Sequence, residues 1–265
     1  MAARDIRRGD AVRQIIAIAL NTFRETVRDR VLTVIVLFAL VMIVGGLWLG
    51  SISLEQQGRM MKDFGLVTVT AFGVIIAAFI AATLVRKEVE KRTVFVVFSK
   101  PVSRAAFVVG KFLGLAATLG VVIGGMGLFL FVMTWLVGGG ASGMVLAATG
   151  LIYLQVLAVV AVVVFFSTVT SAILASMLGL GVFVAGQLSH NVLSLSRLGE
   201  GAVTEAVSWV VFVIIPNFNA VDVKAAVVGE MTIDWAAVAL WGLYLMAYMV
   251  VALGAAAWVM RRKEF

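Results

Sequence analysis

The densest group of side chains that could do chemistry lies in residues 86–111, where acidic, basic and hydroxyl residues mix with valine and phenylalanine. Glu88 and Glu90 come first, and Arg92 and Arg104 follow them. Carboxylates and guanidinium groups on one short segment can form complementary ion pairs across an interface with another protein. We therefore expect these charges to engage a partner rather than only to solvate a surface helix.

The same segment is divided by Pro101. Proline lacks an amide donor and disfavours helix at the residue before it, so the first part of the segment should end there. Ser103 can cap a new helix that runs through Gly110 into the apolar stretch that follows. The sequence therefore predicts a short helix, a break and a second helix, which together make a rigid protrusion able to press on a partner.

Elsewhere, the residues that most catalytic chemistry needs are missing from the sequence. There is no cysteine, which excludes disulfides, cysteine-ligated metals and thiol catalysis. The single histidine, His190, is expected to be an interfacial hydrogen-bonding residue rather than a catalyst. No G-x-x-x-x-G-K-[S/T] loop is present to bind ATP. We expect no enzymatic activity, no metal site and no cofactor on this chain.

The composition is typical of a membrane protein. Hydrophobic residues make up 63% of the chain and charged residues 13%, with a mean hydropathy of +1.12. A spanning helix needs about 20 apolar residues. The charge-free windows predict six spans, at 31–49, 64–85, 112–137, 144–166, 172–188 and 236–260. A turn at residues 167–171, Ser-Thr-Val-Thr-Ser, should separate the fourth from the fifth; alternatively, these hydroxyls bond back to the carbonyls of one unbroken helix.

None of the six windows contains Asp, Glu, Lys or Arg. Ion-coupled carriers need ionisable groups at membrane depth, and intramembrane proteases and lipid-processing enzymes need catalytic groups there. The absence of buried charge therefore disfavours these classes of protein, and energy for transport would have to come from another chain.

Most lysines and arginines fall on one side of this topology. With six spans and both termini inside, the basic residues left outside are Arg59, Lys62, Arg197 and Lys224. This asymmetry follows the positive-inside rule, whereas a seventh crossing at 206–215 would move the C-terminal basic residues to the wrong side. Residues 206–215 are instead expected to be re-entrant or interfacial, within an external segment at 189–235. The net charge of +7 thus reflects membrane orientation and requires no nucleic acid partner.

Residues 1–30 are expected to form an amphipathic helix in the inner interface of the lipid bilayer. Apolar positions recur there at helical spacing: Val12, Ile16, Leu20, Phe23 and Val27. The polar positions turned away from them are Arg13, Asn21, Arg24 and Arg28. Such arginines would lie among anionic head groups. The alternative is a solvated arm.

In these features the sequence resembles the permease subunits of ABC-2-type transporters, the six-helix membrane halves of many bacterial ABC exporters. The resemblance covers nearly the whole chain in topology and is most specific in residues 86–111. The family commonly shows acidic residues there, then Arg-Gly-Thr, a Pro-Val-Ser-Arg stretch and Gly-Lys. The matching residues are Glu88, Glu90, Arg92, Thr93, Ser99, Pro101, Val102, Ser103, Arg104, Gly110 and Lys111. The glycine between Arg92 and Thr93 is missing, which should stiffen the loop.

The resemblance implies one all-α integral membrane domain over residues 1–265. It would have six transmembrane helices, an N-terminal interfacial helix, a cytoplasmic coupling helix in 86–111 between spans 2 and 3, and re-entrant or outer helices between spans 5 and 6. Two permeases, identical or homologous, would bind two separate ABC ATPase subunits, which hold the ATP and Mg. The expected ATPase-coupling residues are Glu88, Glu90, Lys91, Arg92, Thr93, Pro101, Ser103 and Arg104. The chain would lie in the bacterial inner membrane with both termini in the cytoplasm.

The implied function is ATP-driven export by alternating access. Two helical stripes are candidates for the substrate path, although ordinary helix packing would produce the same pattern. They consist of Thr68, Phe72, Phe79 and Thr83 on the second span, and of Ser176, Phe183, Gln187 and His190 on the fifth. Their mostly apolar surroundings favour a hydrophobic or amphipathic cargo. The alternative function is a membrane anchor that transmits ATPase motion to a cell-envelope assembly without moving a solute.

Overall fold

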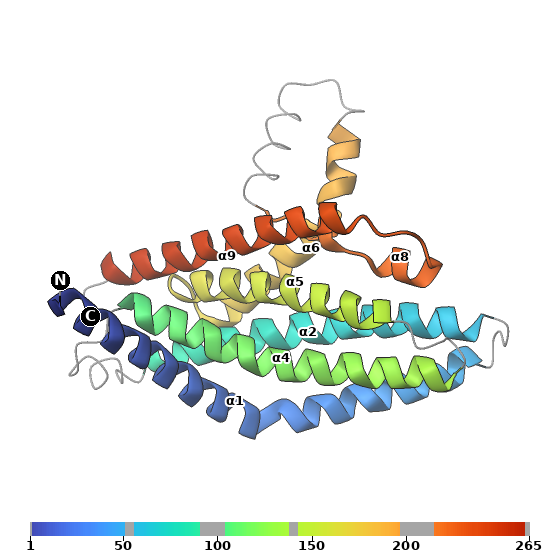
Figure 1. The fold of residues 1–265 in the computed structure, drawn as a ribbon, viewed down its shortest axis with the longest axis horizontal. Coiled ribbons are helices and arrows are strands. Elements are labelled where there is room, and N and C mark those ends of the chain that lie inside the picture. The colour runs from blue at the N-terminus through green and yellow to red at the C-terminus, as the bar shows by residue number, and fades with distance from the viewer. Residues whose placement is uncertain (1, 51–55, 91–103, 138–142, 197–214, 263–265) are drawn as a thin grey trace.

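The computed structural model describes residues 2–50, 56–90, 104–137, 143–196 and 215–262, and every regular element in these ranges is a helix. The elements are α1 (Ala2–Gly50), α2 (Gln57–Glu90), α4 (Arg104–Leu136), α5 (Gly143–Ser167), α6 (Ala172–Ser196), the 3₁₀ helix η1 (Asn219–Val221), α8 (Lys224–Gly229) and α9 (Trp235–Arg262). Most of them run along one axis as an elongated bundle (Figure 1). Both chain termini lie at one end of this bundle, which we call the terminal end; α8 lies at the distal end.

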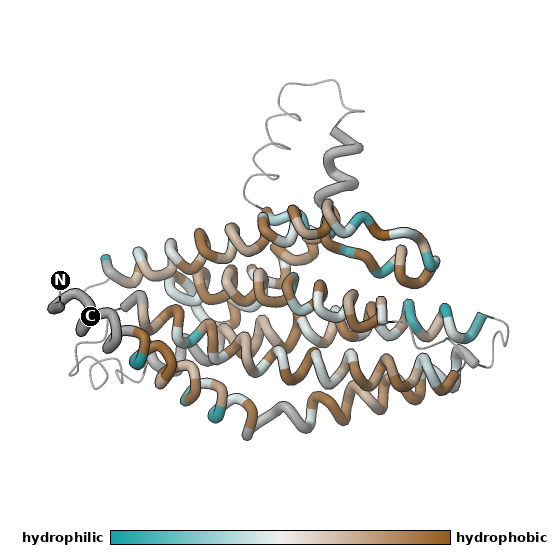
Figure 2. Tube along the Cα trace, in the orientation of Figure 1, coloured by the Kyte–Doolittle hydropathy of each residue, from teal (hydrophilic) through white to brown (hydrophobic). Residues whose placement is uncertain are grey.

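Four helices are long and apolar enough to cross a membrane, as judged from length and composition within the described residues: Gln57–Thr83, Ala106–Leu136, Gly143–Ser167 and Trp235–Met260. Two shorter apolar helical stretches, Thr33–Gly46 and Ala172–Leu188, lie where the first and fifth spans were predicted. Figure 2 shows apolar residues along the middle of the bundle and most polar residues towards its two ends. The chain therefore has the surface of a multi-pass membrane protein.

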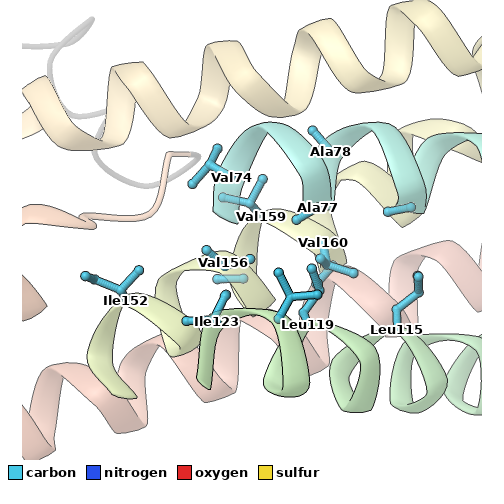
Figure 3. Close-up of a cluster of buried hydrophobic side chains, with 14 of the residues drawn as sticks. Val74, Ala77, Ala78, Leu115, Leu119, Ile123, Ile152, Val156, Val159 and Val160 are labelled. Carbon is cyan, nitrogen blue, oxygen red and sulfur yellow. The ribbon is translucent and has the colours of Figure 1, made fainter. Parts of the chain in front are cut away.

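Helix α5 forms the centre of the bundle, because it packs against α2, α4, α6, α8 and α9. Small and β-branched residues let these helices approach closely. Ala77 and Ala78 of α2, Leu119 of α4, and Val156 and Val160 of α5 are all buried where the three helices meet (Figure 3). By contrast, α9 buries little of its surface within the chain and leaves Leu240, Leu243, Val250 and Val251 exposed.

Helix α1 is continuous from Ala2 to Gly50, so the predicted interfacial helix and first span form one element with a bend near its middle (Figure 1). Residues 2–30, which we call the N-terminal arm, pack on the start of α4. A Cβ atom built on Gly114 would lie 2.5 Å from the Cβ of Thr22 and 2.6 Å from the carbonyl oxygen of Ala19. One built on Gly110 would lie 2.9 Å from the Cβ of Ile18. The two helix backbones are therefore in direct contact, which only glycine permits at these positions.

The face of the arm that contacts α4 is not the predicted apolar stripe. Thr22 and Thr26 are buried, and the Thr26 hydroxyl donates to the carbonyl oxygen of Thr22 at 2.8 Å. Val12, Ile16 and Leu20 of the predicted stripe are each about half exposed. The arm thus packs on the bundle through one face and leaves an apolar edge for its surroundings.

Helix α5 ends at Ser167 and α6 begins at Ala172, so a break lies where the sequence predicted a turn. Three hydroxyls close the end of α5: Ser167, Thr168 and Thr170 donate to carbonyl oxygens three or four residues earlier. Ser171 Oγ then accepts from the Leu174 amide at 3.3 Å and caps α6. The hydroxyls do bond back to carbonyl oxygens, but the helix is broken here, so the alternative of one unbroken helix does not hold. Helix α6 crosses behind α9, and its end leaves the bundle at a steep angle (Figure 1).

The contact between the arm and α4 can be tested with Gly114→Ala. The added methyl group meets the backbone of α1, so we expect a loss of about 1–3 kcal/mol, as for other overpacked cores. Gly124→Ala, on the same helix, is the matched control, because nothing lies within 4 Å of a Cβ there. It should be neutral or stabilising by up to about 1 kcal/mol through helix propensity. Thermal unfolding in detergent measures both, and equal melting temperatures would contradict the contact.

Candidate functional site

The predicted coupling segment joins two helices at the terminal end. Helix α2 continues to Glu90 and α4 begins at Arg104, so Glu88, Glu90 and Arg104 lie on helices that reach the end holding both termini (Figure 1). Residues 86–90, where the predicted coupling segment begins, are therefore a continuation of α2, and the rest of the predicted short helix lies outside the described residues. The other predicted coupling residues, namely Lys91, Arg92, Thr93, Pro101 and Ser103, lie outside the described residues.

The start of α4 is firmly held to the protein at this end. Ala106, Phe107 and Val108 are buried one turn inside Arg104. Lys111 is also buried, with its ammonium nitrogen 5.9 Å from the centroid of the Phe107 ring. Gly110 touches the arm, as described above. The base of the predicted coupling segment is therefore a packed assembly of α4 and α1.

The predicted path residues of α2 change surroundings along the helix. Thr68 is buried, Phe72 is half-buried, and Phe79 and Thr83 are exposed. The Thr68 hydroxyl donates to the carbonyl oxygen of Phe64 at 2.6 Å, and that of Thr83 donates to the carbonyl oxygen of Phe79 at 2.8 Å. Both hydroxyls are thus satisfied within their own helix. Phe72 packs edge-on against Phe38 of α1, with the ring centroids 6.0 Å apart.

Two of the predicted path residues of α6, Ser176 and Phe183, also have partners within the chain. Ser176 is buried and donates to the carbonyl oxygen of Ile173 at 2.8 Å. Phe183 lies 5.4 Å from the ring of Phe218, centroid to centroid, and Gln187 is half-buried. His190 lies on α6, but its side chain is outside the described part. Helices α2 and α6 pack against each other, which brings the two stripes onto neighbouring elements.

Two cavities between the helices contain no residue of the predicted stripes. One, of about 460 Å³, lies at the distal end between α1, α2 and α4. The other, of about 190 Å³, lies between α5, α6 and α9 and is lined by Phe165, Phe166, Val182 and Tyr248, among others. No three His, Asp or Glu side chains gather into a metal site in the described part of the chain.

Part of the predicted external segment, whose contacts the sequence did not indicate, packs into the bundle before α9. Residues 215–231 carry the buried side chains of Phe218, Val221, Val223 and Val227. Phe218 and the carbonyl oxygen of Pro216 sit against Gly186 of α6, where a Cβ would overlap them. We call residues 215–231 the inserted segment. Its position follows the predicted re-entrant window at 206–215, most of which lies outside the described residues.

A buried glutamine holds the inserted segment to the centre of the bundle. Gln155 lies at the middle of α5 and is 1% exposed. Its Nε2 donates to the carbonyl oxygen of Phe218 at 3.0 Å. Side chains cap the turns on either side: Asn217 Oδ1 accepts from the Ala220 amide and Asp222 Oδ1 from the Lys224 amide. A lone amide in the middle of a charge-free window was the sequence signal for this contact, and the sequence analysis did not use it.

Two lysines fasten the inserted segment to α2. Lys62 is 2% exposed, and its Nζ lies 3.2 Å from Glu230 Oε1. Lys224 Nζ lies 2.9 Å from Asp222 Oδ2 and 3.5 Å from Thr70 Oγ1. Both lysines were predicted from the sequence to lie on the outer side of the membrane. The sequence did not indicate the burial of Lys62, which arises because α2 begins at Gln57, seven residues before the predicted span, and its first turns are covered by α8.

Glu230, the partner of Lys62, has an unfavourable backbone conformation. Its φ is 54° and its ψ is 33°, in the left-handed region, at the C-terminal end of α8. It is the one non-glycine residue with positive φ in the described ranges. Glycine is the usual residue at such a position. A glutamate there gives up backbone freedom but supplies the carboxylate that neutralises a buried ammonium group.

The asymmetry of this pair gives a test. The Glu230 side chain is 62% exposed, whereas Lys62 is buried. Lys62→Met leaves a carboxylate that water can solvate, so stability should change little. Glu230→Gln strands a buried ammonium group and should cost more than about 1 kcal/mol. Melting temperatures should rank the parent and Lys62→Met above Glu230→Gln, and the reverse order would show that Lys62 is solvated in the folded protein.

The architecture can now be compared with known proteins. The family model described as ABC-2 family transporter protein matches residues 16–264, which includes part of the N-terminal arm and every later helix. Among proteins with curated functions, none matches the chain significantly. The match agrees with the long apolar helices of the structure. The chain therefore belongs to the ABC-2 transporter family, as a membrane component of an ABC transporter.

Proposed function

We propose that this chain is the permease subunit of an ATP-driven exporter of hydrophobic or amphipathic substrates. It crosses the membrane six times, through α1, α2, α4, α5, α6 and α9, and both termini lie in the cytoplasm of a bacterial cell. Two permeases pair and bind two separate ATPase subunits, which hold ATP and Mg. Closure of the ATPases drives alternating access of a path between the spans. Membership of the ABC-2 family supports the transport role.

The observation that carries this proposal is the placement of the coupling segment. It joins α2 and α4 at the end where both termini lie (Figure 1). The exposed basic residues Arg13 and Arg24 lie on the arm, and Arg262 lies at the end of α9. Clustering of these cations with the coupling segment at one end agrees with a cytoplasmic face.

The arm makes this end suitable for transmitting force. A push on the base of α4 is passed to α1 through the backbone contact of Gly110 and Gly114, because there is no side chain between the helices to absorb it. At the distal end, the inserted segment is held by four buried apolar side chains, two lysine contacts and one amide contact. Movement at the terminal end can therefore reorient α1 and α4 as a unit while the inserted segment stays on α2 and α5.

Sidedness can be tested with single cysteines, because the chain has none of its own. Thr232→Cys, an exposed residue at the distal end, should react with a membrane-impermeant maleimide in intact cells. Arg13→Cys, on the exposed side of the arm, should react only after the membrane is permeabilised. The opposite pattern would invert the topology, and labelling of both in intact cells would contradict six crossings.

Coupling can be tested by charge reversal at Glu88. Truncating one member of a buried interfacial pair costs roughly 2–5 kcal/mol of binding, whereas solvated surface charges tolerate change within about 0.5 kcal/mol. Glu88→Lys should leave the permease folded and inserted but weaken ATPase association or uncouple hydrolysis from transport in vesicles. Glu55→Lys, in the segment between α1 and α2, should do neither. Normal assembly and transport by Glu88→Lys would refute the coupling role.

A further inference from the structure

The larger cavity lies inside one chain, at the distal end, where α1, α2 and α4 diverge. Its volume of about 460 Å³ falls in the range of ligand pockets, roughly 300–1,000 Å³. The lining residues are Met42, Ile43 and Gly46 of α1, Gln57 and Met61 of α2, and Met133 and Val137 at the end of α4. It shares no residue with the predicted substrate stripes or with the coupling segment.

We propose that this cavity binds one acyl chain of a lipid or lipid-like amphiphile from the distal leaflet of the membrane. The walls contain no charged group, and their one amide is that of Gln57. Water in a cavity needs two to four polar partners, which these walls do not supply. A hydrated ion or a sugar would lose its hydrogen bonds there. Hydrocarbon is the occupant that matches the walls.

The surroundings of the cavity also point to the hydrocarbon of the bilayer. Ile43 lines it and is about half exposed, so the cavity opens onto the outer surface of α1. The neighbouring side chains Val44 and Leu136 are apolar and more than half exposed. Trp48 and Trp135 are exposed nearby, and exposed tryptophans gather where acyl chains meet head groups. The opening therefore lies at the depth of the acyl chains just below the head groups.

The walls are suited to a flexible chain rather than to a rigid ligand. Three of the seven lining residues are methionines, one from each helix. Methionine has three rotatable bonds and a polarisable thioether, so it adapts to ligands of variable shape. Gln57, the first residue of α2, can donate its amide to an ester or head-group oxygen while the acyl chain lies along Met42 and Met133.

Gly46→Leu is the sharpest variant for filling the cavity. A Cβ at position 46 would lie 3.3 Å from Met61 Cε and 3.4 Å from its Sδ, the movable end of a side chain, so leucine can enter without meeting backbone. Gly124→Leu adds the same side chain to α4 at a position with nothing within 4 Å of the Cβ. Met133→Trp fills the cavity from the opposite wall and serves if Gly46→Leu fails to fold.

The experiment is photolabelling in lipid nanodiscs of the purified permease. A phosphatidylethanolamine with a diazirine at the end of one acyl chain is irradiated, and labelled peptides are identified by mass spectrometry. We expect adducts at residues 42–46 and 133–137 in the parent and in Gly124→Leu, and a loss of about fivefold or more in both cavity-filling variants. Adducts on the exposed α9 residues Leu240 and Leu243 should be equal in all samples and serve as the internal standard.

A competition experiment distinguishes the two possible sources of the acyl chain. Labelling that is displaced by excess unlabelled diacyl phospholipid assigns the cavity to bilayer lipid, whereas displacement only by a single-chain lysophospholipid assigns it to an amphiphilic cargo. Undiminished adducts at residues 42–46 in both cavity-filling variants would overturn the proposal. So would reaction of Met61→Cys with a water-soluble maleimide in the absence of photo-adducts. The experiment uses no ATPase and no transport readout, so its failure is separate from failure of the proposed function.

Discussion

A non-helical stretch of chain can lie inside an apolar bundle only if its backbone groups find protein partners, because hydrocarbon offers them none. The inserted segment meets this requirement through Gln155, whose amide reaches the carbonyl of Phe218 from the middle of α5. Helix α5 lies at the centre of the bundle, where Gln155 can reach the inserted segment. Gly186 has no side chain, which leaves room for Phe218 and Pro216. The bundle therefore holds a segment whose only helices are the short elements η1 and α8.

The two ends of the bundle are fastened in different ways. At the terminal end, α1 and α4 touch through glycine, and the contact is apolar and continuous. At the distal end, the inserted segment is attached to α2 through charges, with a buried Lys62 and a largely exposed Glu230. Glycine contacts resist sliding because any shift brings backbone against backbone. Ion pairs with one solvated member exchange partners with water more readily.

Family membership was predicted from the sequence and is confirmed by the family model. It could be predicted because the apolar windows and the motif in residues 86–111 are local signals. The break at residues 167–171 was also visible, as a run of hydroxyl residues that can end one helix and cap the next. The burial of Lys62 could not be predicted, because it depends on α8 and on Glu230, which lies 168 residues away along the chain. The partner of the arm was hidden for the same reason: helical spacing identifies Val12 and Ile16 as apolar, but not which face meets α4.

The pairing of α1 with α4 also has a consequence for how the chain is made. Residues 15–22 of the arm find their partner only at Gly110 and Gly114, which leave the ribosome after all of α1 and α2. During that interval, the face that carries Thr22 and Thr26 lacks the helix that will bury it. The first helix must therefore be retained, by the insertion machinery or at the membrane surface, until the third long helix arrives. Docking of α1 on α2 alone therefore cannot complete the packing of the first helix, which needs α4 as well.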